Sequence, residues 1–141
     1  MHRALLAAAL LLAAAPAAAD AKTFRGKTNQ GRSASVVTGA DGVPTKVRIF
    51  YKARCSHQPY VTGGTMYLPP FDSVNAGALK DAGVEHVKGK RKGETAKITS
   101  AVNMRLHGSH WSGTYRVKLV IHYKGRTIDT CQAKRIRWSA K

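Results

Sequence analysis

The sequence predicts an all-β protein, built as one antiparallel β-sandwich of about eight strands with one disulfide. Short runs that alternate apolar and polar residues follow one another along the chain, and glycine-containing turns separate them. No stretch beyond a single turn has the apolar spacing of an amphipathic helix. The alternation leaves open whether the topology is jelly-roll or immunoglobulin-like.

The N-terminus predicts a secretory signal peptide over residues 1–19. A basic start precedes an unbroken Ala/Leu run at 4–15, a proline ends that run, and small residues before Asp20 fit cleavage near Ala19. The run is shorter than the roughly 20 residues that span a membrane. We therefore expect an exported protein, secreted or periplasmic, with residues 20–141 as one β-sandwich domain and no transmembrane segment in the mature chain.

Three alternating runs define the expected strands, at 47–55, 95–106 and 111–124. In each run one set of alternate residues is mainly apolar and the other is basic or polar, with Phe50 and Val120 as exceptions. Successive side chains of a strand point to opposite faces. Each run is therefore expected to bury its apolar side and to expose its charged side.

Turns and less regular segments fill the rest of the chain. Short hairpin turns are expected at 41–42, 108–109 and 124–125, where glycine follows or precedes a polar residue. Residues 75–82 have helical spacing for one turn, bounded and interrupted by glycine. Residues 57–75, which include a Gly-Gly turn and two consecutive prolines, are expected to form a long loop.

Cys55 and Cys131 are the two cysteines of the chain. An even number in an exported protein predicts one disulfide, and closing so long a loop stabilises the fold by about 4 kcal/mol in the chain-entropy model. A reactive thiol or a metal ligand is the alternative, and the chain has no C-x-x-C motif to support it.

Charge is the most informative feature for function. The chain has 24 basic and 7 acidic residues and a net charge of +17, and loss of Arg3 with the signal peptide leaves a net +16. The usual magnitude for a small domain is about 2–8. No acid occurs from Gly42 to Phe71 or from Thr95 to Ile128. Either the excess charge serves solubility and protects strand edges, or it binds polyanions.

The alternation assigns seven of these cations to the outward sides of two strands. If the two strands lie in one sheet, we expect the seven to share one solvent-exposed, anion-binding face. They are Lys46, Arg48, Lys52, Arg54, Arg116, Lys118 and Lys124.

Catalytic and metal-binding motifs are not found. His107 and His110 are two candidate ligands without the third that a zinc site needs. No G-x-S-x-G elbow, phosphate-binding glycine loop or obvious carboxylate pair occurs. Tyr51 and Tyr115 lie on apolar faces, so a base-stacking platform for nucleic acid is not indicated. We expect no catalytic residue, no metal, no cofactor and no specific nucleic-acid partner.

The leading interpretation is a non-catalytic domain, secreted or envelope-associated, whose partner is a polyanion of the envelope or the extracellular space. A small secreted hydrolase that uses a loop carboxylate and a histidine is one alternative. A secreted inhibitor or toxin-like protein, with recognition carried by residues 57–75, is another. The sequence carries no signal of an oligomeric state.

The two ends of the mature chain resemble an uncharacterised group of small exported actinobacterial-type β-domain proteins. The resemblance rests on three features: the F-x-G-x-T-x-Q-G pattern at 24–31, the basic strand ending in Cys at 48–55, and a second Cys at 131 followed by Trp-x-Ala at 138–140. The group often has Thr-Gly after the second Cys, whereas this chain has Gln-Ala-Lys at 132–134. The resemblance implies an exported β-domain and no catalytic activity.

Overall fold

A computed structural model describes residues 20–141, which form strands joined by turns. The predicted signal peptide lies outside the described residues. No helix in residues 20–141 is long and apolar enough to cross a membrane. The nine strands are β1 (Lys22–Thr28), β2 (Ser33–Thr38), β3 (Pro44–Cys55), β4 (Tyr60–Tyr67), β5 (Ser73–Asn75), β6 (Ala78–Lys88), β7 (Glu94–His107), β8 (His110–Tyr123) and β9 (Arg126–Ala140).

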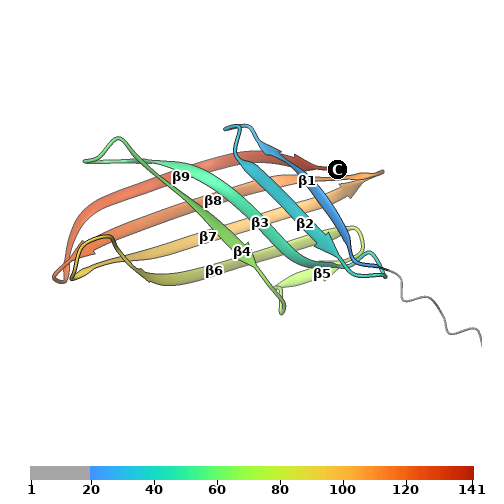
Figure 1. Cartoon of the computed structure of the whole chain (residues 1–141), viewed down its shortest axis with the longest axis horizontal. Helices are drawn as coiled ribbons and strands as arrows, with labels where there is room; N and C mark the ends of the chain where they lie inside the picture. The colour runs from blue at the N-terminus through green and yellow to red at the C-terminus, as the bar shows by residue number, and fades with distance from the viewer. Residues whose placement is uncertain (1–19) are drawn as a thin grey trace, which may run out of the picture.

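All nine strands belong to one antiparallel sheet with the order β4-β3-β2-β1-β9-β8-β7-β6-β5. Figure 1 shows that β1–β4 cross over β6–β9, so the sheet folds over on itself into two layers. The long strand β9 joins them, because its end pairs with β1 and its earlier residues pair with β3. The predicted all-β class is confirmed, and the layering is consistent with the predicted sandwich.

The core lies between the two layers. Val47, Ile49 and Tyr51 of β3 are buried, and so are Tyr115 and Val117 of β8. The rings of Tyr51 and Tyr115 lie 5.8 Å apart between centroids, so the apolar side of β3 faces the apolar side of β8. Because side chains alternate along a strand, the opposite sides of these two strands point away from each other into solvent.

Buried hydroxyl pairs also join the layers. Thr65 Oγ1 and Tyr115 Oη lie 2.6 Å apart, and Tyr67 Oη donates to Ser100 Oγ at 2.7 Å. Burial raises the pKa of both tyrosines above its ordinary value. These contacts fix β4 against β7 and β8, because a buried polar group left without a partner is costly.

The structure corrects two local expectations. Residues 75–82 form a β-hairpin, not a helical turn, since β5 and β6 pair there and the side chain of Asn75 accepts the Gly77 N–H at 2.8 Å. Residues 57–75 include a full strand, β4, rather than one long loop. The Gly-Gly pair lies inside that strand, where a Cβ on Gly63 would come within 2.7 Å of Tyr51 Oη.

The predicted disulfide is confirmed. Cys55 ends β3 and lies directly opposite Cys131 of β9, with the two sulfur atoms bonded. The bond therefore fastens the two layers at the place where β3 and β9 meet.

Candidate anion-binding surfaces

The seven cations predicted to share one face are distributed over the outward sides of both layers and one turn. Those on β3 are exposed on the outward side of one layer, and Arg116 and Lys118 are exposed on the outward side of the other. Lys124 lies in the β8–β9 turn.

The apolar sides of β3 and β8 pack against each other, which turns Lys46 and Arg48 away from Arg116. At the other end of β3, Arg54 is in register with Gln132 of β9, and Gln132 is in register with Lys118 of β8, so the outward sides of the two layers are continuous there. The seven cations therefore do not lie on one flat face, and whether they bind anions stays a prediction.

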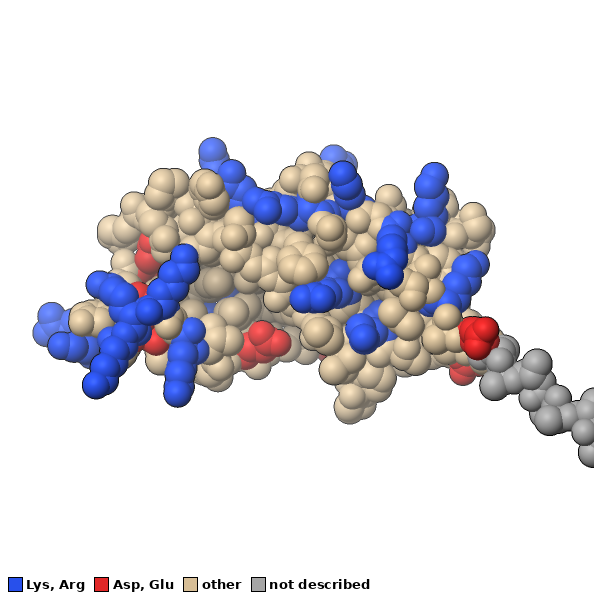
Figure 2. Space-filling view, viewed as in Figure 1, with Lys and Arg blue, Asp and Glu red and all other residues tan. Residues whose placement is uncertain are grey.

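We call the first surface the β3 face. It lies on the outward side of β1–β4, and Figure 2 shows Lys and Arg side chains distributed over this side of the molecule. Arg25 of β1 lies in register with Ser35, which is in register with Arg48 of β3, so β1 contributes to the same side. The cations of the β3 face are Arg25, Lys27, Lys46, Arg48, Lys52 and Arg54.

Aromatic rings accompany the cations of the β3 face. The Arg48 guanidinium lies 4.7 Å from the centroid of the Phe50 ring, and Lys52 Nζ lies 3.8 Å from the centroid of the Tyr60 ring. Cation–π attraction of this kind holds the side chains over the rings and leaves their charge in solvent.

We call the second surface the β8 face, on the outward side of β6–β9. Ala82, Ala101 and Arg116 lie side by side across β6, β7 and β8. The residues two positions before and after these on each strand form neighbouring rows, and their side chains point to the same outward side. The exposed cations of the β8 face include Lys80, Lys97, Arg105, Arg116, Lys118, Lys134, Arg135 and Arg137.

A β-bulge concentrates charge on the β8 face. Tyr115 of β8 pairs with Ile136 and Val117 pairs with Ala133, so Lys134 and Arg135 together lie opposite the single residue Arg116. Such a bulge re-aims side chains and recurs next to functional sites. Here it brings three cations from two strands to one place, which we call the bulge cluster: Arg116, Lys134 and Arg135.

The bulge cluster borders a hollow on the surface. One depression of about 520 Å³ is lined by the bulge cluster together with Lys80, Ala82 and Ala101. A second, of about 560 Å³, adjoins it and shares Ala82, Ala101, Arg116 and Lys134 with the first. The side chains of the two alanines are short, so the surface between the longer side chains around them is recessed.

The cations of both faces have no carboxylate partner among residues 20–141. In that part of the chain, one ion pair joins a Lys or Arg side chain to a carboxylate. It is formed by Arg91 and Glu94, where the β6–β7 turn meets the start of β7. Asp72 and Asp81 border the hollow, yet they accept backbone N–H groups: Ala82 N donates to Asp72 Oδ2 at 3.2 Å, and Asp72 N to Asp81 Oδ1 at 3.3 Å. The negative charges of these two aspartates therefore offset only part of the positive charge of the four cations that line the hollow.

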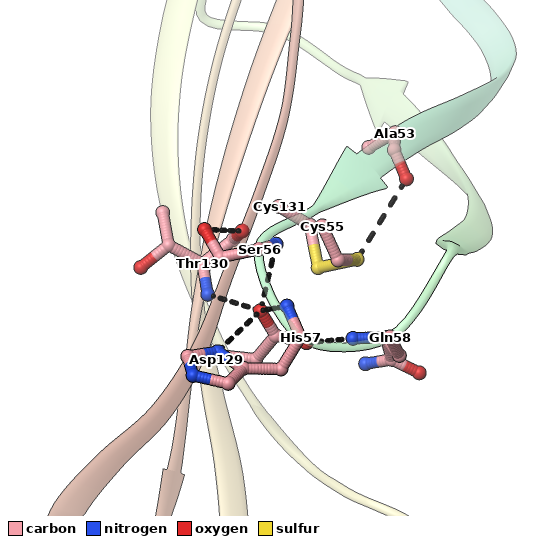
Figure 3. A network of polar contacts seen from close by, with 8 residues as sticks. All are labelled: Ala53, Cys55, Ser56, His57, Gln58, Asp129, Thr130 and Cys131. Atoms are coloured by element: carbon pink, nitrogen blue, oxygen red, sulfur yellow. Dashed lines mark hydrogen bonds and ion pairs between the residues drawn. A yellow bond between two sulfur atoms is a disulfide. The ribbon is translucent and has the colours of Figure 1, made fainter.

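Asp129 forms a separate polar network beside the disulfide (Figure 3). Its Oδ1 accepts the backbone N–H groups of Ser56, His57 and Thr130 at 3.0, 3.0 and 2.8 Å, and its Oδ2 accepts that of Gln58 at 3.0 Å. Burial opposes ionisation of the carboxyl, but the four donors outweigh that effect and lower its pKa to about 2. The carboxylate holds the turn after β3 against β9.

Two groups of side chains have the types of atom that bind metal ions, but neither is well suited to do so. Ligand atoms of Cys55, Asp129 and Cys131 lie within 4.8 Å of one another, but both sulfur atoms are joined in the disulfide and the carboxylate is engaged by backbone donors. The rings of His107 and His110 lie 5.9 Å apart across the β7–β8 turn. No third ligating side chain within residues 20–141 joins them.

No protein-family model, curated protein or solved structure matches the chain. The resemblance of its two ends to small exported actinobacterial-type proteins stays a prediction. The fold and its surfaces define an all-β structure, fastened by one disulfide, with cations on the outward sides of both layers.

The sequence reasoning missed two contributors to these surfaces. Arg25 and Lys27 alternate with Phe24 and Gly26 in the first strand, which is a short strand signal. The consecutive cations at 134–135 interrupt the alternation of β9, and an interruption of this kind is the sequence signal of a bulge.

Proposed function

We propose that this protein is an exported, non-catalytic domain, secreted or envelope-associated, that binds anionic polymers or surfaces through its outward cations. The single observation that carries the proposal is the combination of two densely basic faces with a near absence of ion pairs within residues 20–141. Like charges on neighbouring strands destabilise a sheet, so their accumulation has a cost that solubility alone does not require.

Counterion release supplies the physical mechanism. A polyanion that contacts several Lys and Arg side chains displaces the ions condensed on it, and affinity falls steeply as salt rises. A strongly positive surface also speeds encounter with anionic partners by long-range steering. Both effects act on any dense polyanion, which in the compartment predicted for this chain means an envelope polymer, an acidic polysaccharide or an anionic headgroup surface.

The hydrolase alternative has weaker support. His57 Nδ1 lies 3.5 Å from Asp129 Oδ1, which is the one histidine–carboxylate contact within residues 20–141. That carboxylate already accepts four backbone N–H groups, and Ser56 Oγ donates to the Thr130 carbonyl at 3.4 Å. The Asp129 carboxylate and the Ser56 hydroxyl are thus engaged in holding the turn. The Ser56 hydroxyl donates to a carbonyl, whereas a nucleophile paired with its base would donate to the His57 imidazole.

The inhibitor or toxin alternative also loses support, because β4 occupies much of the segment expected to form a free recognition loop.

Salt-dependent binding tests the proposal, with heparin and isolated cell envelope as probes. Two variants reverse charge on one face each: Arg48→Glu with Lys52→Glu on the β3 face, and Arg116→Glu with Lys118→Glu on the β8 face. Lys90→Glu with Lys92→Glu, in the β6–β7 turn, is the matched control because it changes the net charge equally. At least one face variant should weaken binding more than the control does, and the parent should lose affinity steeply as salt rises.

Equal loss in all three variants would mean that net charge alone, and no defined face, attracts the polyanion. No binding by the parent at low salt would refute the proposed function.

A further inference from the structure

The β8 face differs from the β3 face in its shape and in its chemistry. It is hollowed at its centre, where Ala82 and Ala101 lie beside the bulge cluster. On the β3 face, by contrast, the ring of Phe50 lies over Gly64. A Cβ on Gly64 would come within 2.9 Å of that ring. The β8 face therefore offers a recess that a chain-like ligand can enter.

Hydroxyl and amide side chains surround the recess. Asn103 and Thr114 lie in the row next to the two alanines, and Thr99 and Gln132 lie in the row on the other side. All four are exposed, and each borders one of the two depressions. These groups both donate and accept hydrogen bonds, which is what a ligand rich in hydroxyl groups requires.

Aromatic side chains are missing from the outward side of this recess. Tyr115 contributes to the border of the first depression, but its side chain is 1% exposed and its ring packs against Tyr51 in the core. Proteins that bind single-stranded nucleic acid combine a positive groove with aromatic rings on which bases stack. The recess provides the positive charge without the stacking surface.

The bulge cluster supplies an anion site of definite composition. Two arginines can each donate two parallel N–H bonds to a carboxylate or sulfate, and a lysine adds a third positive charge. A polymer with an anionic group on successive sugar units would place one group at the cluster while its neighbouring units occupy the low alanine floor.

On this basis, and resting on the proposed function, we propose that the recess of the β8 face binds a linear acidic polysaccharide. The anionic group of one sugar contacts Arg116, Lys134 and Arg135. Its hydroxyl groups, and those of the adjoining units, bond to the surrounding Asn, Thr and Gln side chains. The β3-face cations Lys46, Arg48 and Lys52 take no part in this recognition, whereas Arg54 adjoins Gln132 where β3 pairs with β9.

Titration with defined oligomers tests the inference. The probes are an oligogalacturonate and an oligothymidylate of equal charge number, measured by calorimetry at one salt concentration. Two variants address the recess: Lys134→Glu with Arg135→Glu removes the anion site, and Ala82→Trp fills the floor without a change in charge. Ala82→Ser, and Arg48→Glu with Lys52→Glu, are the controls. Circular dichroism and thermal melting of each variant establish that the fold is retained.

We expect the parent to bind oligogalacturonate more tightly than oligothymidylate. Ala82→Trp should weaken oligogalacturonate binding by about tenfold or more, since it excludes the sugar units from the floor. Lys134→Glu with Arg135→Glu should have at least that effect, and Ala82→Ser should leave affinity near that of the parent.

Three results would overturn the inference. They are tighter binding of oligothymidylate, an Ala82→Trp variant that binds oligogalacturonate as well as the parent does, or a larger loss from the β3-face variant than from the bulge variant. In each of these cases the protein still binds polyanions, so the proposed function would stand although this inference would not. Failure of the parent to bind either oligomer or heparin at low salt would remove the proposed function as well.

Discussion

Replacing Asp129 by Asn tests how strongly one carboxylate fastens the turn after β3. The substitution keeps the size of the side chain but exchanges one oxygen for an NH₂ group, which cannot accept a bond from the backbone donors it faces. In the native protein those donors are the N–H groups of residues 56–58 and of Thr130. The side chain is 5% exposed, so water does not replace the lost acceptor well.

The magnitude follows from the lowered pKa. The Asp129 carboxyl has a pKa of about 2 in the folded protein, against 3.8 for an ordinary aspartate. One pKa unit corresponds to about 1.4 kcal/mol, so ionisation of this group contributes about 2 kcal/mol to the free energy of unfolding. Because the folded pKa is the lower one, that stability is fully present above about pH 5 and is lost as the pH falls towards 2.

Urea denaturation of the parent and of Asp129→Asn at pH 6 and at pH 2 measures the effect. At pH 6 the variant should be less stable by about 2 kcal/mol or more, since it lacks the charge and leaves a donor without an acceptor. At pH 2 the difference should shrink by about 2 kcal/mol, because the parent carboxyl is then half protonated when folded and nearly fully protonated when unfolded.

Comparison with the variant cancels the other carboxyl groups, which titrate in both proteins. A stability difference that is the same at both pH values would refute the argument, because it would show that the N–H donors do not lower the pKa of this group.

Three further predictions concern the chain and its packing. Cys55→Ala with Cys131→Ala should lower the free energy of unfolding by about 4 kcal/mol in urea, and a loss below about 1 kcal/mol would contradict the entropic account of this cross-link. Gly113→Ala should destabilise the fold by about 1–3 kcal/mol by thermal melting, because the added Cβ would strike the backbone of β7 at Asn103; a parent-like melting temperature would show that the two strands separate easily. N-terminal sequencing of exported protein should start at Asp20 or shortly after it, and an intact N-terminus on cytoplasmic protein would contradict the predicted signal peptide.

The alternating strands could be predicted because burial has a direct signature in period 2. Val47, Ile49 and Tyr51 are buried as that pattern requires, and so are Tyr115 and Val117. The pairing of Cys55 with Cys131 could also be predicted, since two cysteines in a chain predicted to be exported permit one intramolecular disulfide.

The relative placement of strands could not be predicted in the same way. Alternation states which side of a strand is buried, but it does not state which other strand lies across the core. The cations of β3 and β8 are therefore outward, as expected, but the apolar sides of the two strands face each other across the core, so these cations do not form one flat face. Strand β4 was missed because Gly63 and Gly64 are typical of a turn, whereas here they make room for the rings of Tyr51 and Phe50.

The bulge cluster could be predicted from the sequence only in part, because it depends on a local feature of β9 and on the pairing of β9 with β8. Two adjacent cations at 134–135 interrupt the alternation of β9, which the sequence displays. That they lie opposite Arg116 depends on the pairing register of β8 with β9, which a single sequence does not state.

The turn between β3 and β4 is held by three consecutive residues of β9. Cys131 binds it through sulfur, the Thr130 carbonyl accepts the Ser56 N–H at 3.0 Å, and the Asp129 carboxylate accepts three of its N–H groups. A reducing agent breaks the first fastening and leaves the carboxylate charged, whereas acid neutralises the carboxylate and leaves the disulfide whole. The junction of the two layers is therefore held by two fastenings with different chemistry, and we expect that releasing this turn to a protease takes reduction and acidification together.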